Sequence, residues 1–332
     1  MNNKMRILIT GACGSVGSAL VKRFLVDGHT VCAFDQSEDG LFRLDQEFKN
    51  HDKGEFRPFL GSVRDANRLR VAMENVDLVF HCAALKHVYL SEYNPFEATQ
   101  TNIEGTHNVI ESAIAANVKN VVMTSSDKAV NPTSTMGATK LLGERLIVAA
   151  NHISGSHKTR FSCVRFGNVI NSNGSVLQIF KKQMENGFPI TITDPNMTRF
   201  FISMGQAVDL CIFAATEMIG GEIFVMDMGS TDIMTFAKAV SFGNPFNYEV
   251  IGFKPGEKLY EELVTEGEAL RTVVMGNIYV VCPDTLDMMA VDIQSQYKKY
   301  ENYAKLGEPL RSDRVPLDEN KLRAILDNVL TN

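Results

Sequence analysis

The chain has 332 residues, of which 45% are hydrophobic, so it is long and apolar enough to bury a large core in one domain or two packed domains. Its formal net charge is only −6 and it has no basic run, which argues against nucleic acid as a partner. No apolar stretch reaches the roughly 20 residues that cross a bilayer, and no secretory signal precedes the first expected strand, so we expect a cytoplasmic protein without a membrane segment. The six scattered cysteines predict reduced thiols and no metal site.

Strand-like and helical patterns alternate along the first half of the chain. Expected strands cover residues 6–10, 31–35, 56–60, 77–82, 121–125 and 161–166, and expected helices cover residues 16–26, 67–74, 95–116 and 135–150. This alternation predicts an α/β fold, a Rossmann-type doubly wound parallel sheet with helices on both faces.

Turn-forming residues become frequent after about Asn171. They cluster at residues 186–189, 194–196, 243–245 and 254–256. We therefore expect a nucleotide-cofactor domain over residues 1–170, to which some later segments return. Residues 171–332 are expected to form mainly a smaller substrate-binding lobe and C-terminal helices.

A glycine-rich turn follows the first expected strand and opens a helix. It reads Thr10-Gly11-Ala12-Cys13-Gly14-Ser15-Val16-Gly17. Backbone N–H groups in such a turn, together with the helix N-terminus, can receive a pyrophosphate. We expect a dinucleotide to contact Gly11, Cys13, Gly14, Ser15, Val16 and Gly17.

Asp35 closes the second expected strand, where a carboxylate can accept hydrogen bonds from both hydroxyls of an adenosine ribose. No arginine follows in Gln36-Ser37-Glu38, so a 2′-phosphate would meet negative charge and NAD is favoured over NADP. Asp65, after the third expected strand, can reach the adenine edge or can cap the next helix. Both roles stay open.

The fifth expected strand ends in Ser126-Asp127-Lys128, which brings a hydroxyl, a carboxylate and an amine to the ligand-binding edge of a parallel sheet. Met136 and Lys140 follow, one helical turn apart. Here the sequence resembles the extended short-chain dehydrogenase/reductase family, in which a Tyr-x-x-x-Lys helix follows such a strand. Met136 stands in the tyrosine position, and its thioether cannot exchange a proton.

This departure is similar to a variant among the UDP-N-acetylglucosamine 4,6-dehydratases of polysaccharide and flagellar sugar biosynthesis. The chain resembles that group over about residues 6–265, with shared motifs at residues 81–88, 126–129, 165–169, 197–201 and 254–259. The resemblance implies NAD as cofactor and UDP-N-acetylglucosamine, or a close UDP-sugar, as substrate. The implied reaction is transient C4 oxidation, elimination of water across C5 and C6, and hydride return, which gives a 4-keto-6-deoxy sugar.

This chemistry needs one base, one acid and a held nicotinamide. We expect Lys128 to be the C5 base, with its pKa lowered by the positive nicotinamide and Lys140. Asp127 is expected to protonate the departing C6 hydroxyl and to receive the C4 proton, directly or through a water. Ser126 is expected to bind the C4 oxygen, Lys140 to hold the nicotinamide ribose, and Met136 only to shape the pocket.

Further contacts are expected around the nucleotide-sugar. Ala83 is expected beside the cofactor, and Lys86 and His87 can either touch the sugar diphosphate or be structural. The resemblance implies nucleotide contacts from Asn168, Ser175, Arg199 and Glu257, with Asn168 and Arg199 on the diphosphate and Glu257 on the uridine ribose. Arg165 is expected to anchor its strand and Glu92 to lie on the surface.

Two other functions stay open. A UDP-sugar 4-epimerase or decarboxylase can use the same scaffold, although the missing tyrosine argues against it. An NAD-binding sensor without catalysis is the second alternative, because fold does not guarantee function. The stereochemistry at C5 is also open. Members of the family associate through helices that correspond to residues 95–116 and 135–150, so we expect a homo-oligomer, a dimer or larger.

Overall fold

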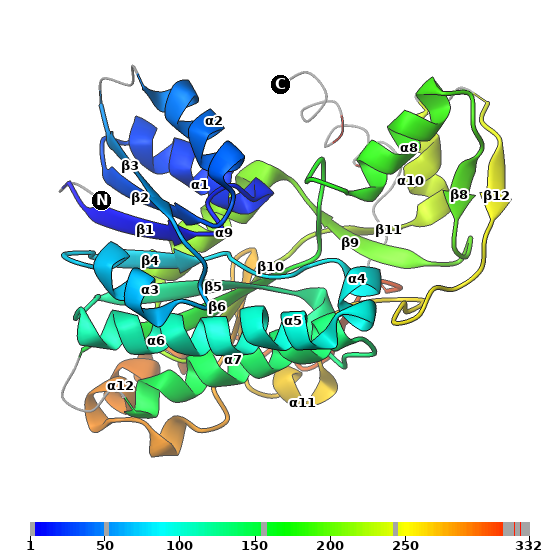
Figure 1. Cartoon of the computed structure of the whole chain (residues 1–332). Coiled ribbons are helices and arrows are strands. Elements are labelled where there is room, and N and C mark those ends of the chain that lie inside the picture. The colour runs from blue at the N-terminus through cyan, green and yellow to red at the C-terminus, as the bar shows by residue number, and fades with distance from the viewer. Residues whose placement is uncertain are drawn as a thin grey trace.

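The computed structural model describes residues 4–49, 53–153, 158–241 and 245–314, together with Leu322 and Leu326. A nine-stranded sheet runs through it in the order β14-β15-β10-β6-β5-β4-β1-β2-β3 (Figure 1). Its parallel strands are β1 (Arg6–Thr10), β2 (Thr30–Asp35), β3 (Glu55–Leu60), β4 (Leu78–His81), β5 (Asn120–Ser126), β6 (Arg160–Phe166) and β10 (Ile223–Met226). Antiparallel β15 (Ile278–Val281) and β14 (Thr272–Met275) extend one edge. The order 3-2-1-4-5-6 confirms the predicted Rossmann-type sheet.

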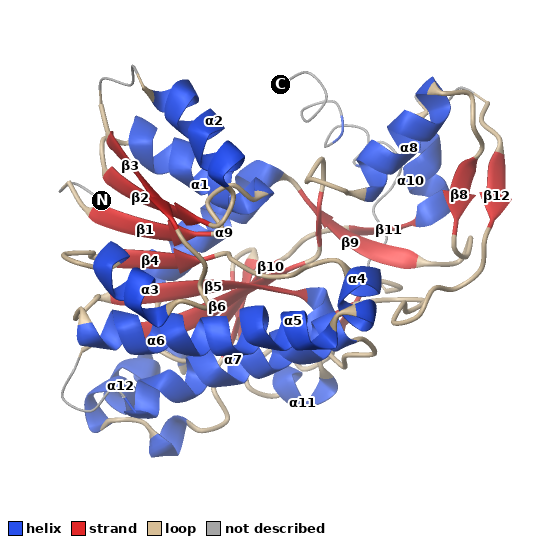
Figure 2. Ribbon diagram, viewed as in Figure 1, coloured by secondary structure: helices blue, strands red, loops and turns tan. Residues whose placement is uncertain are grey.

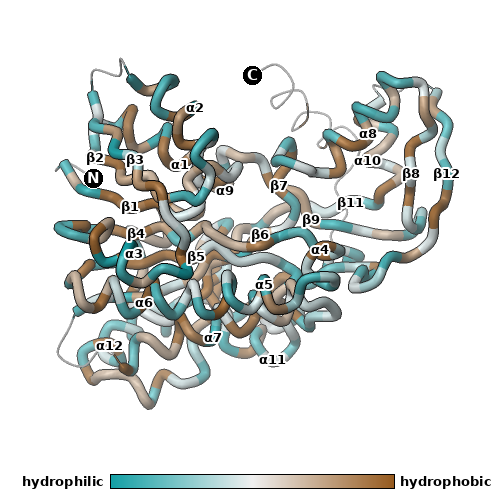
Figure 3. Tube along the Cα trace, in the orientation of Figure 1, coloured by the Kyte–Doolittle hydropathy of each residue, from teal (hydrophilic) through white to brown (hydrophobic). Residues whose placement is uncertain are grey.

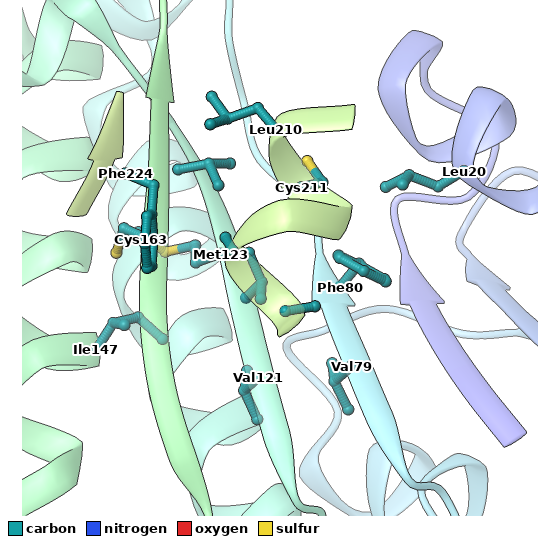
Figure 4. Close-up of a cluster of buried hydrophobic side chains, with 14 of the residues drawn as sticks. Leu20, Val79, Phe80, Val121, Met123, Ile147, Cys163, Leu210, Cys211 and Phe224 are labelled. Atoms are coloured by element: carbon teal, nitrogen blue, oxygen red, sulfur yellow. The ribbon is translucent and has the colours of Figure 1, made fainter. Parts of the chain in front are cut away.

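Helices cover both faces of this sheet (Figure 2). One face carries α1 (Ser15–Val26), α2 (Glu38–Phe48) and α9 (Met204–Glu217), and the other carries α3 (Ala66–Ala72), α6 (Gly105–Ala115) and α7 (Thr135–Ile153). Leu210 and Cys211 of α9 are fully buried in the same core as Phe80, Met123 and Phe224 of the strands (Figure 4). Strands that are covered by helices on both faces consist mainly of hydrophobic residues (Figure 3).

The helix expected over residues 95–116 is interrupted. It forms as α5 (Pro95–Thr99), a π-helical turn (Gln100–Glu104) and α6. Within this turn, the Asn102 side chain accepts from Leu85 N at 2.8 Å and donates to Leu85 O at 3.1 Å and Thr139 Oγ1 at 3.0 Å. Such π-turns often occur at functional sites. Here Asn102 ties the loop after β4 to helix α7.

A second lobe lies beyond the carboxyl ends of the parallel strands (Figure 1). Its elements are β7 (Asn168–Val169), α8 (Val176–Glu185), β8 (Ile190–Ile192), β9 (Thr198–Ile202), β11 (Ser230–Asp232), α10 (Ile233–Val240) and β12 (Tyr248–Val250). They enclose a core of their own around Leu177, Phe201 and Phe236. Because β10, β14 and β15 belong to the large sheet and α9 packs on it, although all four follow residue 170, the two lobes interleave along the chain.

The remaining elements are short and belong to neither of these two sets. They are α4 (Val88–Tyr93), β13 (Glu262–Val264), α11 (Glu266–Ala269), α12 (Val291–Gln296), β16 (Leu310–Arg311) and 3₁₀ turns at Asp127–Ala129, Leu286–Met288 and Tyr297–Tyr300. Of the turn expected at residues 243–245, residues 243 and 244 lie outside the described part. Among the described helices, none combines the length and apolarity needed to cross a bilayer.

Candidate active site

A pocket of about 570 Å³ lies at the carboxyl ends of β1, β4, β5 and β6, between the two lobes. Its walls come from the glycine turn, the end of β2, the loop after β4, the end of β5, the start of α7 and residues 166–176. This volume is typical of small-molecule sites, and the position is the crevice where open α/β sheets bind ligands.

The glycine turn forms one end of the pocket. Gly11 has a φ of +67°, and a Cβ there would lie 2.6 Å from Ala83 N. A Cβ on Gly17 would overlap the carbonyl oxygen of Gly11. Gly14, Ser15 and Val16 open helix α1 on the pocket wall, where the first N–H groups of the helix have no intrahelical partner. Close backbone packing and free N–H groups fit a pyrophosphate.

Asp35 is held in place beside this turn. Its carboxylate accepts from Cys13 N and from Ser37 N, each at 2.9 Å, and it lines the pocket. Each oxygen keeps a further lone pair, so both ribose hydroxyls can still be received. Cys13 contributes through this backbone bond and is not on the pocket wall. Asp65 is also absent from the wall, and its side chain caps helix α3 by accepting from Arg68 N at 3.0 Å.

Buried hydroxyls fix the loop after β4. Thr10 Oγ1 lies 2.7 Å from His81 Nδ1 and accepts from Ala83 N at 3.3 Å. On its other side, the His81 ring reaches Thr106 Oγ1 at 3.0 Å. Burial lowers the pKa of His81 to about 3, so the ring is neutral. It donates one hydrogen bond and accepts another, and so links the two threonine hydroxyls. Ala83 therefore has a fixed position on the pocket wall.

Lys86 and His87 also line the pocket, and both meet the loop before α8. Lys86 Nζ donates to Asn173 O at 2.8 Å, while Asn173 N donates to Ser15 Oγ at 2.9 Å. A Cβ on Gly174 would lie 3.1 Å from the His87 ring. The segment around Asn173 thus bridges the glycine turn and the loop after β4 across the pocket.

Ser126, Asp127 and Lys128 form one hydrogen-bonded group where β5 ends. Asp127 Oδ1 accepts from Ser126 Oγ at 2.7 Å and from Lys128 Nζ at 3.0 Å. Ser126 and Lys128 line the pocket, but Asp127 is fully buried behind them. The expectation that Asp127 meets a sugar directly therefore fails in this structure, and a proton exchanged with Asp127 must pass through Ser126 or Lys128.

The prediction of a lowered pKa for Lys128 is wrong for the free site. Burial favours the neutral amine, but the carboxylates of Asp127 and Glu261 outweigh burial and Arg199, and they raise the pKa of Lys128. The amine lies 3.7 Å from Glu261 and donates to Asn168 Oδ1 at 3.3 Å. Lys128 is therefore protonated in the free site and must lose a proton before it can act as a base.

Met136 and Lys140 lie on the pocket wall from helix α7, as their spacing predicts. Lys140 Nζ donates to Thr124 O at 2.6 Å, and burial lowers its pKa. Glu92, which we expected on the surface, is partly exposed, and its carboxylate accepts from Thr135 N at 2.5 Å and so holds the first turn of α7. A carboxylate at a helix N-terminus is stabilising.

The four residues expected on the nucleotide divide into two pairs. Asn168 and Ser175 line the pocket, and the buried Ser175 Oγ has no hydrogen-bond partner among the described residues. Arg199 and Glu257 are not on the wall. Arg199 donates to the carbonyl oxygens of Thr198, Leu259 and Lys258, and Glu257 accepts from Lys254 N at 3.1 Å. In this structure both side chains are engaged in these bonds outside the pocket wall.

Sequence reasoning missed Asn102 and Glu261, which act on the site from behind its wall. Glu261 is 3% exposed and contacts Lys128, although 133 positions along the chain separate them. No local motif signals such a pair. Among the described residues, no cluster of histidine, cysteine, aspartate and glutamate side chains is arranged to hold a metal ion.

Comparisons with known proteins agree with this architecture. The family model described as "Polysaccharide biosynthesis protein" matches residues 7–283. An uncharacterized membrane protein of Methanocaldococcus jannaschii is 46% identical over 85% of this chain and 86% of its own length. The inverting UDP-N-acetylglucosamine 4,6-dehydratase of Campylobacter jejuni is 39% identical over 90% of this chain and 87% of its own. A UDP-glucose 4-epimerase of Rickettsia bellii is 38% identical over 85% of this chain and 84% of its own length.

Solved structures extend the likeness to the whole chain. The structure described as Pen from Bacillus thuringiensis is 38% identical, covers 98% of both chains and has a TM-score of 0.89. The dTDP-glucose 4,6-dehydratase DesIV of Streptomyces venezuelae, crystallised with NAD, is 20% identical with a TM-score of 0.69 over 77% of this chain and 87% of its own, which shows the shared fold. The chain therefore belongs to the polysaccharide biosynthesis protein family, within its group of extended short-chain dehydrogenase/reductase-like proteins.

Proposed function

We propose that this protein is an NAD-dependent UDP-sugar 4,6-dehydratase with UDP-N-acetylglucosamine as substrate. The observation that carries the proposal is the hydrogen-bonded group of Ser126, Asp127 and Lys128 at the pocket, next to a methionine where related reductases have tyrosine. An amine and a carboxylate provide the base and the acid that elimination needs, without a phenol.

The residues present fit NAD. The glycine turn would receive the pyrophosphate, Asp35 the adenosine ribose, and Lys140 the nicotinamide ribose. When bound, NAD supplies reversible oxidation at C4, which makes the C5 hydrogen acidic. Ser126 would bind the C4 oxygen and link it to Asp127, which can take up and return a proton through that hydroxyl. Lys128, once neutral, would accept the C5 proton. The proton that Asp127 takes up from the C4 hydroxyl would return through Ser126 to the C6 hydroxyl, which leaves as water.

The cofactor assignment predicts a preference that binding measurements can check. Purified protein should bind NAD more tightly than NADP, because a 2′-phosphate would approach the Asp35 carboxylate, and no arginine or lysine follows Asp35 in Gln36-Ser37-Glu38. Asp35→Ala should weaken NAD binding and reduce the discrimination between the two. If calorimetry shows tighter NADP binding by the wild type, the assignment of Asp35 is wrong.

Met136 should contribute shape alone. Met136→Leu nearly conserves volume and polarity, so we expect a stability change below about 1.5 kcal/mol and turnover within a few-fold of the wild type. Steady-state kinetics and thermal unfolding measure both. A loss of about 10² in turnover, with the fold intact, would assign Met136 a role in the chemistry.

Incubation with UDP-N-acetylglucosamine, followed by mass spectrometry, tests the proposed function. The expected product is lighter than the substrate by one water. The second candidate, a UDP-sugar 4-epimerase, is favoured by the name of the Rickettsia bellii relative, and its product would keep the substrate mass. A protein that only senses NAD would leave the sugar unchanged.

A further inference from the structure

Behind the pocket wall, the Glu261 carboxylate lies among three cations. It is 3.7 Å from Lys128 Nζ, 3.4 Å from Lys258 Nζ and 3.9 Å from Arg199 Nε. The side chain is 4% exposed, and no hydrogen bond from the described residues reaches its Oε2 atom. A buried carboxylate is costly unless cations compensate it, and here Lys258 faces Oε2 while Lys128 and Arg199 face Oε1.

The backbone holds Glu261 rigidly. Its N–H donates to Ser312 Oγ at 2.9 Å, and its carbonyl accepts from Ser312 N at 2.9 Å. Lys258 Nζ donates to Val130 O at 2.7 Å, which fastens the preceding loop to the turn that follows Lys128. The carboxylate therefore projects from a fixed support toward the amine of Lys128.

We propose that Glu261 is a positioning residue that acts through Lys128: its carboxylate holds the lysine amine at the pocket wall, beside Asp127 and Asn168, and stabilises its ammonium form while the site is free. The charged groups around this amine are Asp127 on its own turn, Glu261 before β13 and Arg199 on β9. Both carboxylates stabilise the ammonium form and Arg199 opposes it. The meaning of this arrangement for turnover rests on the proposed function.

Titration of Lys128 in the free protein tests the proposal without any turnover. Trace acetylation with acetic anhydride over a pH series, quantified by peptide mass spectrometry, gives the pH midpoint of amine reactivity. Glu261→Gln keeps the shape and removes one negative neighbour, so the midpoint should fall by about one pH unit or more. Glu262→Gln is the matched control, because Glu262 pairs with Asn131 instead, and its midpoint should equal that of the wild type.

Lys258→Gln should act in the opposite direction. Without Lys258, Glu261 interacts more strongly with Lys128, so the midpoint should rise. If Glu261→Gln does not fold, the pH midpoint of Lys128 in Lys258→Gln tests the proposal in its place. Equal midpoints in the wild type and Glu261→Gln, an equal fall in Glu262→Gln, or an unchanged or lower midpoint in Lys258→Gln would each overturn the proposal.

The pH profile of kcat/KM adds a readout of the reaction. A lysine base acts only when neutral, so the rate rises as pH passes its pKa, and Glu261→Gln should move this acid limb to lower pH by the same interval as the midpoint. A protein that fails to dehydrate the sugar but shows the acetylation shift refutes the proposed function alone. A protein that dehydrates the sugar without the shift refutes the role of Glu261 alone.

Discussion

Replacing Lys128 with alanine should lower turnover by about 10² or more, the size expected when a proton-transfer group is removed. Lys128 is the amine on the pocket wall at the end of β5, where it is 24% exposed and bonded to Asp127. In D₂O, the variant should also lose the incorporation of solvent deuterium at C5. Steady-state kinetics and mass spectrometry of the product measure the two effects.

Two controls separate this effect from loss of the fold or of the cofactor. NAD content should match the wild type, because the proposed cofactor contacts come from the glycine turn, Asp35 and Lys140. Lys119→Ala removes a lysine whose side chain is 78% exposed on the surface and should leave turnover unchanged. If Lys128→Ala keeps near-normal turnover and exchange, another group is the C5 base.

Replacing Arg165 with methionine should lower the free energy of unfolding by about 3–5 kcal/mol, since it leaves two buried carboxylates without their cation. The Arg165 side chain is 1% exposed and forms paired hydrogen bonds to Glu144, at 3.1 and 2.7 Å, and to Glu268, at 3.0 and 3.1 Å. It also donates to Leu263 O. This cluster confirms that Arg165 anchors its strand. Urea denaturation at neutral pH measures the loss.

The loss should shrink in acid. Burial opposes ionisation of Glu268, but Arg165 outweighs it and holds the pKa of that carboxyl at about 2, below its ordinary 4.5. The stabilisation is therefore present above about pH 4.5 and disappears as pH falls toward 2. Arg160→Met on the same strand is the control, because its partner Asp292 is 65% exposed and such pairs contribute less than about 1 kcal/mol. Equal losses in the two variants would refute a special role for the buried cluster.

The sequence predicted the parallel strands because strands buried on both faces are continuous apolar runs, and it predicted the cofactor end because the glycine turn is a local motif. It did not predict α2 or α9. The signals for both are local, namely Ser37 accepting from Gly40 N and a capping box between Ser203 and Gln206. The π-helical turn around Asn102 carries no sequence signature in an otherwise regular helical pattern.

The sequence predicted which kinds of side chain stand at the end of β5, but it did not predict how neighbouring charges act on them. One of the two carboxylates that raise the pKa of Lys128 belongs to Glu261, which reaches the amine through a tertiary contact between distant segments. The same folding of the chain puts Asp127 behind the wall and turns Arg199 toward carbonyl oxygens. The spacing of residues along the sequence cannot show that a side chain such as Asp127 is covered by its neighbours.

The measurement that tests the central claim most directly is the mass of the product formed from UDP-N-acetylglucosamine in D₂O. A 4,6-dehydratase that uses Lys128 as the C5 base should give a product that has lost one water and gained one deuterium at C5, without accumulation of reduced nicotinamide. A product that keeps the substrate mass, or an unchanged substrate in the presence of bound NAD, would contradict the account.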